Sequence, residues 1–188
     1  MEALVTSTLV VAIAEIGDKT QLLALVLACR FRRPVPIALG ILIATLANHA
    51  AAAWIGGWLE QMLAPSVLHW VLGGSFGMAG WALIPDNLDT EAMPKPAVTG
   101  PFLTALVAFF LVEIGDKTQV ATIALAMRFD SLITVVLGTT LGMMLANLPV
   151  VFLGDGIAAR LPLKLVRLTA AAIFAVLGLV ALLGPLLS

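Results

Sequence analysis

Six long apolar runs, separated by short polar or proline-rich stretches, dominate the chain. They cover residues 3–28, 36–59, 66–84, 101–127, 132–157 and 163–186. Most of them reach the roughly 20 residues that an α-helix needs to cross the hydrocarbon core of a bilayer. The sequence lacks the period-two alternation that is typical of a membrane barrel. The pattern therefore predicts an all-α integral membrane protein with six transmembrane helices.

Composition supports this prediction and excludes several classes of function. Hydrophobic residues make up 61% of the 188 positions and charged residues only 11%, whereas about 25% of residues are charged in an ordinary soluble domain. The net charge of −1 offers no basic surface for nucleic acid, and the single cysteine, Cys29, can form no internal disulfide. The N-terminal segment lacks the basic region of a signal peptide, so we expect it to belong to the first helix.

The heptapeptide EIGDKTQ occurs twice, at 15–21 and 113–119, with an offset of 98 residues. Further identities follow at or next to this offset, among them Arg30 with Arg128, Phe31 with Phe129, Gly40 with Gly138, and Asn48 with Asn147. The chain is therefore an internal duplication, with three-helix repeats at 1–84 and 101–188 and an acidic linker at 85–100. Because three is odd, the second repeat must enter the membrane from the opposite side, which predicts the inverted topology of many secondary transporters.

Basic residues outside the heptapeptides predict the orientation in the membrane. The loops on one predicted face of the membrane carry seven basic residues, and those on the opposite face carry Arg128 alone. The seven are Arg30, Arg32, Arg33, Lys95, Arg160, Lys164 and Arg167. By the positive-inside rule, we expect the loop at 85–96 in the cytoplasm and both termini outside. Small residues in the third span, including a GxxxG at 73–77, predict close helix packing within the chain, with a homodimer as the alternative.

The glutamates that begin the two heptapeptides lie near the centres of their predicted spans. Residues three apart share one face of a helix, so we expect each copy to form an oxygen-bearing stripe. The two stripes would consist of Glu15, Asp18 and Gln21, and of Glu113, Asp116 and Gln119. A charge at this depth costs about 2.5–3.5 kcal/mol, so these groups must face one another, water or a cation rather than lipid. Inverted topology would bring the two stripes together near the midplane.

The charge and the donor types of these stripes predict a divalent cation as the occupant. Four carboxylates and two lysines, counted over both copies, leave a net charge of 2 − 4 = −2. Carboxylate and amide oxygens suit Mn²⁺, Ca²⁺ or Mg²⁺ better than zinc or copper. The predicted ligands are Glu15, Asp18, Gln21, Glu113, Asp116 and Gln119, joined by Asn48 and Asn147 from the second and fifth spans. His49 is turned about 100° away from Asn48 around the helix, so we expect it to pack or to line a cavity.

The same acids predict coupling to protons. Without a metal they repel one another in a low-dielectric site until some bind protons, so metal binding would release protons. The predicted proton-coupling residues are Glu15, Asp18, Glu113 and Asp116. Gly17 and Gly115 would permit close approach or a local helix break that offers carbonyl oxygens, and we expect Lys19 and Lys117 to act as counter-charges.

Other interpretations of the acidic copies are open. Glu15 with Lys19 and Glu113 with Lys117 could form buried salt bridges that only hold helices together. An intramembrane aspartyl protease would need two acids in distinct surroundings, whereas the two copies here are identical, which favours a transporter over an enzyme. A passive divalent-cation channel is harder to distinguish from an exchanger by sequence. Tight carboxylate ligation nevertheless favours the binding and release of an exchanger over the fast flow of a channel.

The twin ExGDKT motif in a six-span chain resembles the transmembrane protein 165 family of cation/proton antiporters, and the resemblance covers the whole chain. It implies transport of Mn²⁺, or of Ca²⁺, in exchange for protons, with no cofactor besides the transported ion. The family's cation-binding acids fall on Glu15, Asp18, Glu113 and Asp116, and the motifs are completed by Lys19, Thr20, Lys117 and Thr118. Likeness to the bacterial members implies Mn²⁺ export across the bacterial inner membrane.

Overall fold

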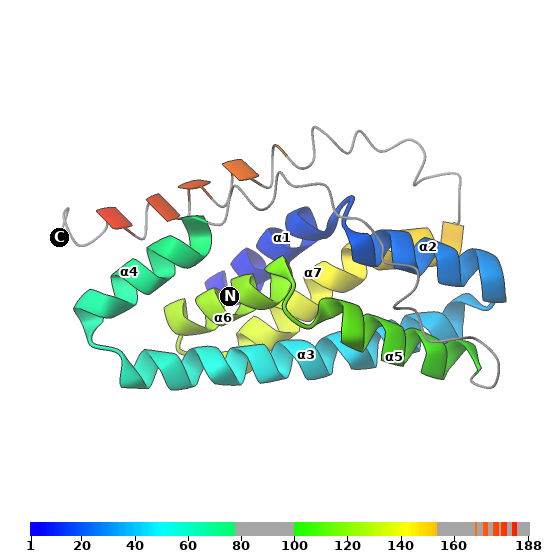
Figure 1. Ribbon diagram of the computed structural model, residues 1–188, viewed down its shortest axis with the longest axis horizontal. Helices are drawn as coiled ribbons and strands as arrows, with labels where there is room; N and C mark the ends of the chain where they lie inside the picture. Colours follow the sequence, from blue (N-terminus) through cyan, green and yellow to red (C-terminus); the bar gives the residue numbers. More distant parts are fainter. Residues whose placement is uncertain are drawn as a thin grey trace.

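The computed structural model describes residues 1–77 and 100–153, together with isolated residues between 168 and 183 (Figure 1). The predicted linker and most of the last predicted span lie outside these residues. The described ranges contain helices and no strand, which confirms the all-α prediction. The helices are α1 (Glu2–Glu15), α2 (Lys19–Phe31), α3 (Pro34–Met62), α4 (Pro65–Phe76), α5 (Pro101–Glu113), α6 (Lys117–Arg128) and α7 (Leu132–Leu153).

Two of the helices, α3 with 29 residues and α7 with 22, are long and apolar enough to cross a membrane. They correspond to the predicted spans at 36–59 and 132–157. The predicted spans at 3–28 and 101–127 are instead each divided into two helices, α1 with α2 and α5 with α6. The prediction of a continuous helix was therefore wrong in both places, whereas the local break expected at the heptapeptide glycines is confirmed.

The two breaks have the same backbone conformation. Ile16 and Ile114 leave the helix in extended conformations, with ψ of 118° and 123°. The next residues, Gly17 and Gly115, have φ of 81° and 76°. Glycine adopts this left-handed region readily because it has no Cβ. The sequence IG at these positions thus encodes the end of one helix and a change of direction before the next.

An aspartate starts the helix that follows each break. Asp18 and Asp116 are extended, with ψ of 168° and 162°, and occupy the N-cap positions of α2 and α6. Their backbone amides donate to the carbonyl oxygens of Glu15 at 3.0 Å and Glu113 at 3.1 Å. Aspartate is favoured at an N-cap because its carboxylate can accept from the first free amides of the helix, and Asp18 accepts from the amide of Lys19 at 2.8 Å. The acids therefore sit at helix ends, where the backbone also turns.

The main packing of the fold joins one repeat to the other, since α1 packs along α7 and α3 packs along α5. A Cβ placed on Gly40 of α3 would lie 2.5 Å from the carbonyl oxygen of Phe102 in α5, and one on Gly138 of α7 would lie 2.7 Å from that of Leu4 in α1. The 98-residue offset relates Gly40 to Gly138 and Leu4 to Phe102, so the two contacts are equivalent. The repeats therefore hold each other through equivalent contacts, which is a two-fold pseudo-symmetry.

Helix directions agree with this relation. In Figure 1, α1 and α2 run toward the end of the bundle where α3 begins, while α5 and α6 run away from that end. The apolar core forms two clusters, one supplied mainly by α1 and α6 and the other by α2 and α5, with α3 and α7 contributing to both. The breaks, which join α1 to α2 and α5 to α6, therefore lie between the two apolar clusters.

Candidate cation site

Carboxylates from the two breaks converge inside the bundle. Glu15, Asp18 and Asp116 each offer an oxygen atom within 4.8 Å of the others, and their exposed fractions are 0%, 1% and 1%. Oxygen ligands at about 2.1–2.5 Å from a cation are about 4–5 Å apart when they lie on opposite sides of it. The three carboxylates are therefore close enough to share one divalent cation, and they come from both repeats.

Two ion pairs cross between the repeats at this point. Lys19 Nζ lies 2.8 Å from Asp116 Oδ1, and Lys117 Nζ lies 3.0 Å from Asp18 Oδ1. The two pairs are related by the 98-residue offset, so they are another instance of the pseudo-symmetry. The lysines thus contact the acids as expected of counter-charges, but each of these contacts joins the two repeats, whereas the salt-bridge interpretation placed both partners on one helix.

Glu15 is held by its own copy of the heptapeptide. The Thr20 hydroxyl donates to Glu15 Oε2, while Glu15 Oε1 has no hydrogen-bond partner within the described part of the chain. Buried carboxylate oxygens are nearly always satisfied in folded proteins. An oxygen of this kind beside two aspartates is available to a cation or a proton. In the second copy, Thr118 donates instead to Asp116 Oδ2 at 3.2 Å.

Glu113 has different surroundings, supplied by α3. His49 Nε2 lies 2.8 Å from Glu113 Oε1, and the Thr45 hydroxyl donates to Glu113 Oε2 at 3.4 Å. The expectation that His49 only packs or lines a cavity missed this contact with a predicted ligand. Thr45 and His49 are four residues apart and therefore share a helix face, but nothing in the sequence places that face against Glu113.

The glutamines close the breaks. Gln21 Oε1 accepts from the Gly17 amide at 2.9 Å, and Gln119 Oε1 accepts from the Gly115 amide at 2.7 Å. Gln21 Nε2 also donates to the carbonyl oxygen of Ala146 at 3.0 Å. The predicted stripes of acids and glutamine on one continuous helix are therefore wrong, because the helix ends inside each stripe. That the glutamines bind metal stays a prediction.

The amide nitrogen of Asn48 joins α3 to α5, whereas that of Asn147 bonds within α7. Asn48 Nδ2 donates to the carbonyl oxygen of Phe110 at 3.1 Å. Asn147 Nδ2 donates to the Met143 carbonyl at 3.1 Å and approaches the Met143 sulfur at 2.9 Å. Asn147 Oδ1 is buried with no hydrogen-bond partner in the described ranges. A role for either asparagine as a metal ligand stays a prediction.

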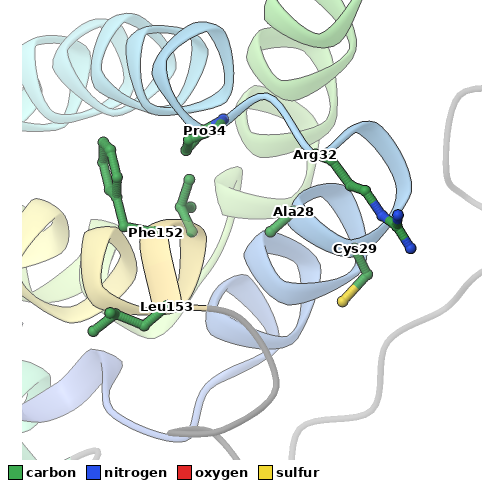
Figure 2. A pocket seen from close by; sticks show the side chains of 7 residues that line it. Ala28, Cys29, Arg32, Pro34, Phe152 and Leu153 are labelled. Carbon is green, nitrogen blue, oxygen red and sulfur yellow. The ribbon is translucent and has the colours of Figure 1, made fainter.

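A pocket of about 400 Å³ lies elsewhere, where α2 ends, α3 begins and α7 ends (Figure 2). Its lining consists of Ala28, Cys29, Arg32, Pro34, Val151, Phe152 and Leu153. Arg32 and the apolar side chains offer no oxygen ligands from carboxylates, so the pocket does not suit a divalent cation. None of the predicted site residues lines it.

Comparison with known proteins covers nearly the whole chain. A family model described as "Divalent cation/proton antiporter GDT1" matches residues 3–91 and 101–187, and each segment contains one heptapeptide. A protein of Vibrio cholerae serotype O1 named "Putative manganese exporter" is 52% identical over 181 residues, which are 95% of this chain and 90% of the relative. The "GDT1-like protein 5" of Arabidopsis thaliana is 28% identical over 211 aligned positions, covering 92% of each chain. No solved structure matches the chain significantly.

Proposed function

The chain belongs to the GDT1 family of divalent cation/proton antiporters, and from this premise we propose that it exports Mn²⁺ in exchange for protons. The resemblance expected from the twin heptapeptides is confirmed at the level of the family. The family consists of transporters rather than enzymes. The transported ion is the substrate, and the proposal requires no further cofactor.

One observation carries the proposal, namely the convergence of Glu15, Asp18 and Asp116 at the point where the two helix breaks meet. Carboxylates buried to this degree need a counter-charge, and the donor set is the one that hard divalent cations prefer. Because two of the acids come from one repeat and the third from the other, the cation would be held only while the repeats are apposed. We propose this cluster, with Glu113, as both the cation site and the source of proton coupling.

The cross-repeat lysines give a physical basis for exchange. An arriving cation would compete with Lys19 for Asp116 and with Lys117 for Asp18, the pairs now 2.8 and 3.0 Å apart. When the cation leaves, protons and the lysines restore the charge balance of the acids. Movement of one repeat against the other, along the pseudo-two-fold relation, would open the site to alternate sides in turn.

Manganese is the preferred substrate in this proposal, with Ca²⁺/H⁺ exchange as the second candidate. The relative from Vibrio cholerae, 52% identical, is named as a manganese exporter. Oxygen donors alone would also accept Ca²⁺. A nitrogen donor next to Glu113 is the feature of this structure that favours Mn²⁺, since imidazole suits transition metals better than Ca²⁺.

The distribution of polarity supports placement in a membrane. Buried positions hold the acids, whereas large apolar side chains cover the outside of α3 and α7, for example Leu39 and Leu137, each 49% exposed. Exposed apolar surface of this kind suits lipid. We propose that both termini lie outside the bacterial inner membrane, as the distribution of basic residues predicts, and that the repeats are inverted.

The proposal can be tested with purified full-length protein in liposomes that contain a pH-sensitive dye. Addition of Mn²⁺ outside should produce uptake of Mn²⁺ and release of protons. Glu15→Gln and Asp116→Asn should each lower the rate at least tenfold, because each removes one carboxylate of the shared cluster. Asp130→Asn is the matched control, since Asp130 is an exposed acid in the turn before α7 and should leave the rate unchanged.

Two outcomes of this experiment would overturn the proposal. Equal rates for the wild type and both site variants would show that the cation passes elsewhere. Cation flux without any proton movement would indicate a passive channel.

A further inference from the structure

His49 and Glu113 form an unusual contact in the interior of the bundle. His49 Nε2 and Glu113 Oε1 lie 2.8 Å apart, and both side chains are 0% exposed. Neither of these atoms has a hydrogen-bond partner among the described residues, and nor does His49 Nδ1. Two polar atoms at this separation would normally be aligned as donor and acceptor. Here they are close without that alignment.

Two ligands of one metal ion show this arrangement. Donor atoms bound at about 2.1 Å and at right angles lie about 3 Å apart, because both point at the metal and not at each other. The 2.8 Å between His49 Nε2 and Glu113 Oε1 matches that spacing. Thr45, one turn before His49, bonds to the other oxygen of Glu113 and steadies the carboxylate.

The contact occurs in only one repeat. Asn48 corresponds to Asn147, so the counterpart of His49 is Leu148. A leucine has no donor atom, so this contact cannot be required by the two-fold pseudo-symmetry of the packing. The second break supplies both Glu113 and Asp116, and Asp116 belongs to the carboxylate cluster. His49 and Glu113 are themselves outside the group of three carboxylates that lie within 4.8 Å of one another, so the imidazole would offer a nitrogen donor next to that cluster, on the side of Glu113.

We propose that His49 is a selectivity ligand, which binds the transported cation together with Glu113 and favours Mn²⁺ over Ca²⁺ and Mg²⁺. This inference rests on the proposed function. Ca²⁺ and Mg²⁺ take oxygen ligands almost exclusively, whereas imidazole nitrogen binds first-row transition metals well. A single nitrogen donor therefore favours Mn²⁺ over Ca²⁺ and Mg²⁺, and the neighbouring oxygen ligands still suit Mn²⁺.

The direct test is pulsed electron paramagnetic resonance of Mn²⁺ bound to the purified full-length protein. The wild type should show modulation from the ¹⁴N nucleus of a coordinated imidazole, and His49→Gln should lose it. His69→Gln is the control, because it removes the other histidine of the chain, and it should keep the signal. Bound Mn²⁺ with no ¹⁴N modulation in the wild type would overturn the inference, although Mn²⁺/H⁺ exchange in liposomes would still support the proposed function.

Transport selectivity gives a second measurement. In His49→Gln, an amide oxygen replaces the nitrogen, so the preference for Mn²⁺ over Ca²⁺ in competition uptake should fall about tenfold. An unchanged preference in a variant that still transports would mean that His49 only positions Glu113. If the wild type neither binds nor transports Mn²⁺, the proposed function itself fails.

Discussion

At the scale of single residues, the heptapeptide gives each position a separate task. Glycine permits the turn, aspartate starts the next helix, glutamine closes the break, and glutamate ends the first helix with its side chain buried. The residue types of the candidate site could be predicted from the sequence because buried charge in an apolar chain is rare. Their arrangement could not, because helical spacing was applied across Gly17 and Gly115, whose positive φ ends the helix.

His49 shows a different limit of prediction. It has no counterpart in the second repeat, so the duplication that identified the other site residues gave no signal for it. The pairing of Lys19 with Asp116 was equally hidden, because spacing along the chain favours a partner on the same helix. Contacts between repeats become visible only when the repeats are packed together.

Gly115→Ala should lower both stability and transport. Gly115 has a φ of +76°, and a Cβ added there would meet nothing within 4 Å, so the strain of the backbone is the whole effect. The expected loss is about 1 kcal/mol of unfolding free energy, and Gly115→Asn should recover part of it, because asparagine tolerates this region better. Thermal unfolding in detergent measures the difference. Gly74→Ala, also without neighbours within 4 Å, should be neutral or slightly stabilising.

The cross-repeat ion pairs can be tested by a double-mutant cycle. Lys117→Met and Asp18→Asn should each destabilise the protein, and the double variant should lose less than the sum, with a coupling of about 0.5–3 kcal/mol. Lys117→Met should be worse than Lys19→Met, because the Lys117 side chain is 8% exposed and that of Lys19 is 24% exposed. Additive effects in unfolding by denaturant would contradict a direct interaction.

At the scale of elements, two long helices support two broken ones. The apolar runs predicted α3 and α7 well, because a continuous run of adequate length suffices for a helix. The division of the other runs into α1 with α2 and α5 with α6 follows from one glycine in each. Broken helices place backbone ends and acids at the same depth, which a continuous helix cannot do.

Close packing of α3 on α5 and of α7 on α1 depends on Gly40 and Gly138. Alanine at either position would place a Cβ within 2.5 or 2.7 Å of a backbone oxygen, so the helices must separate. Gly40→Ala and Gly138→Ala should each destabilise the protein by about 1–3 kcal/mol, as measured by thermal unfolding. A large effect from one and none from the other would contradict the equivalence of the two contacts.

At the scale of the whole molecule, both copies of the heptapeptide contribute carboxylates to the proposed cation site. Among the described helices, equivalent packing, equivalent breaks and reciprocal ion pairs relate the two repeats as a two-fold pseudo-symmetry would. The surroundings of the two glutamates depart from that symmetry, since Glu15 accepts from the Thr20 hydroxyl while Glu113 contacts His49. The symmetric parts suit a mechanism in which the repeats move against each other, and the asymmetric parts suit recognition of a particular cation.

The central claim is that both repeats form a single cation site, and the stoichiometry of Mn²⁺ binding tests it most directly. Calorimetric titration of the purified full-length protein should give one Mn²⁺ per chain. Glu15→Gln from the first repeat and Asp116→Asn from the second should each abolish binding, whereas Asp130→Asn should leave it intact. Two sites per chain in the wild type, with one retained in either variant, would contradict the account.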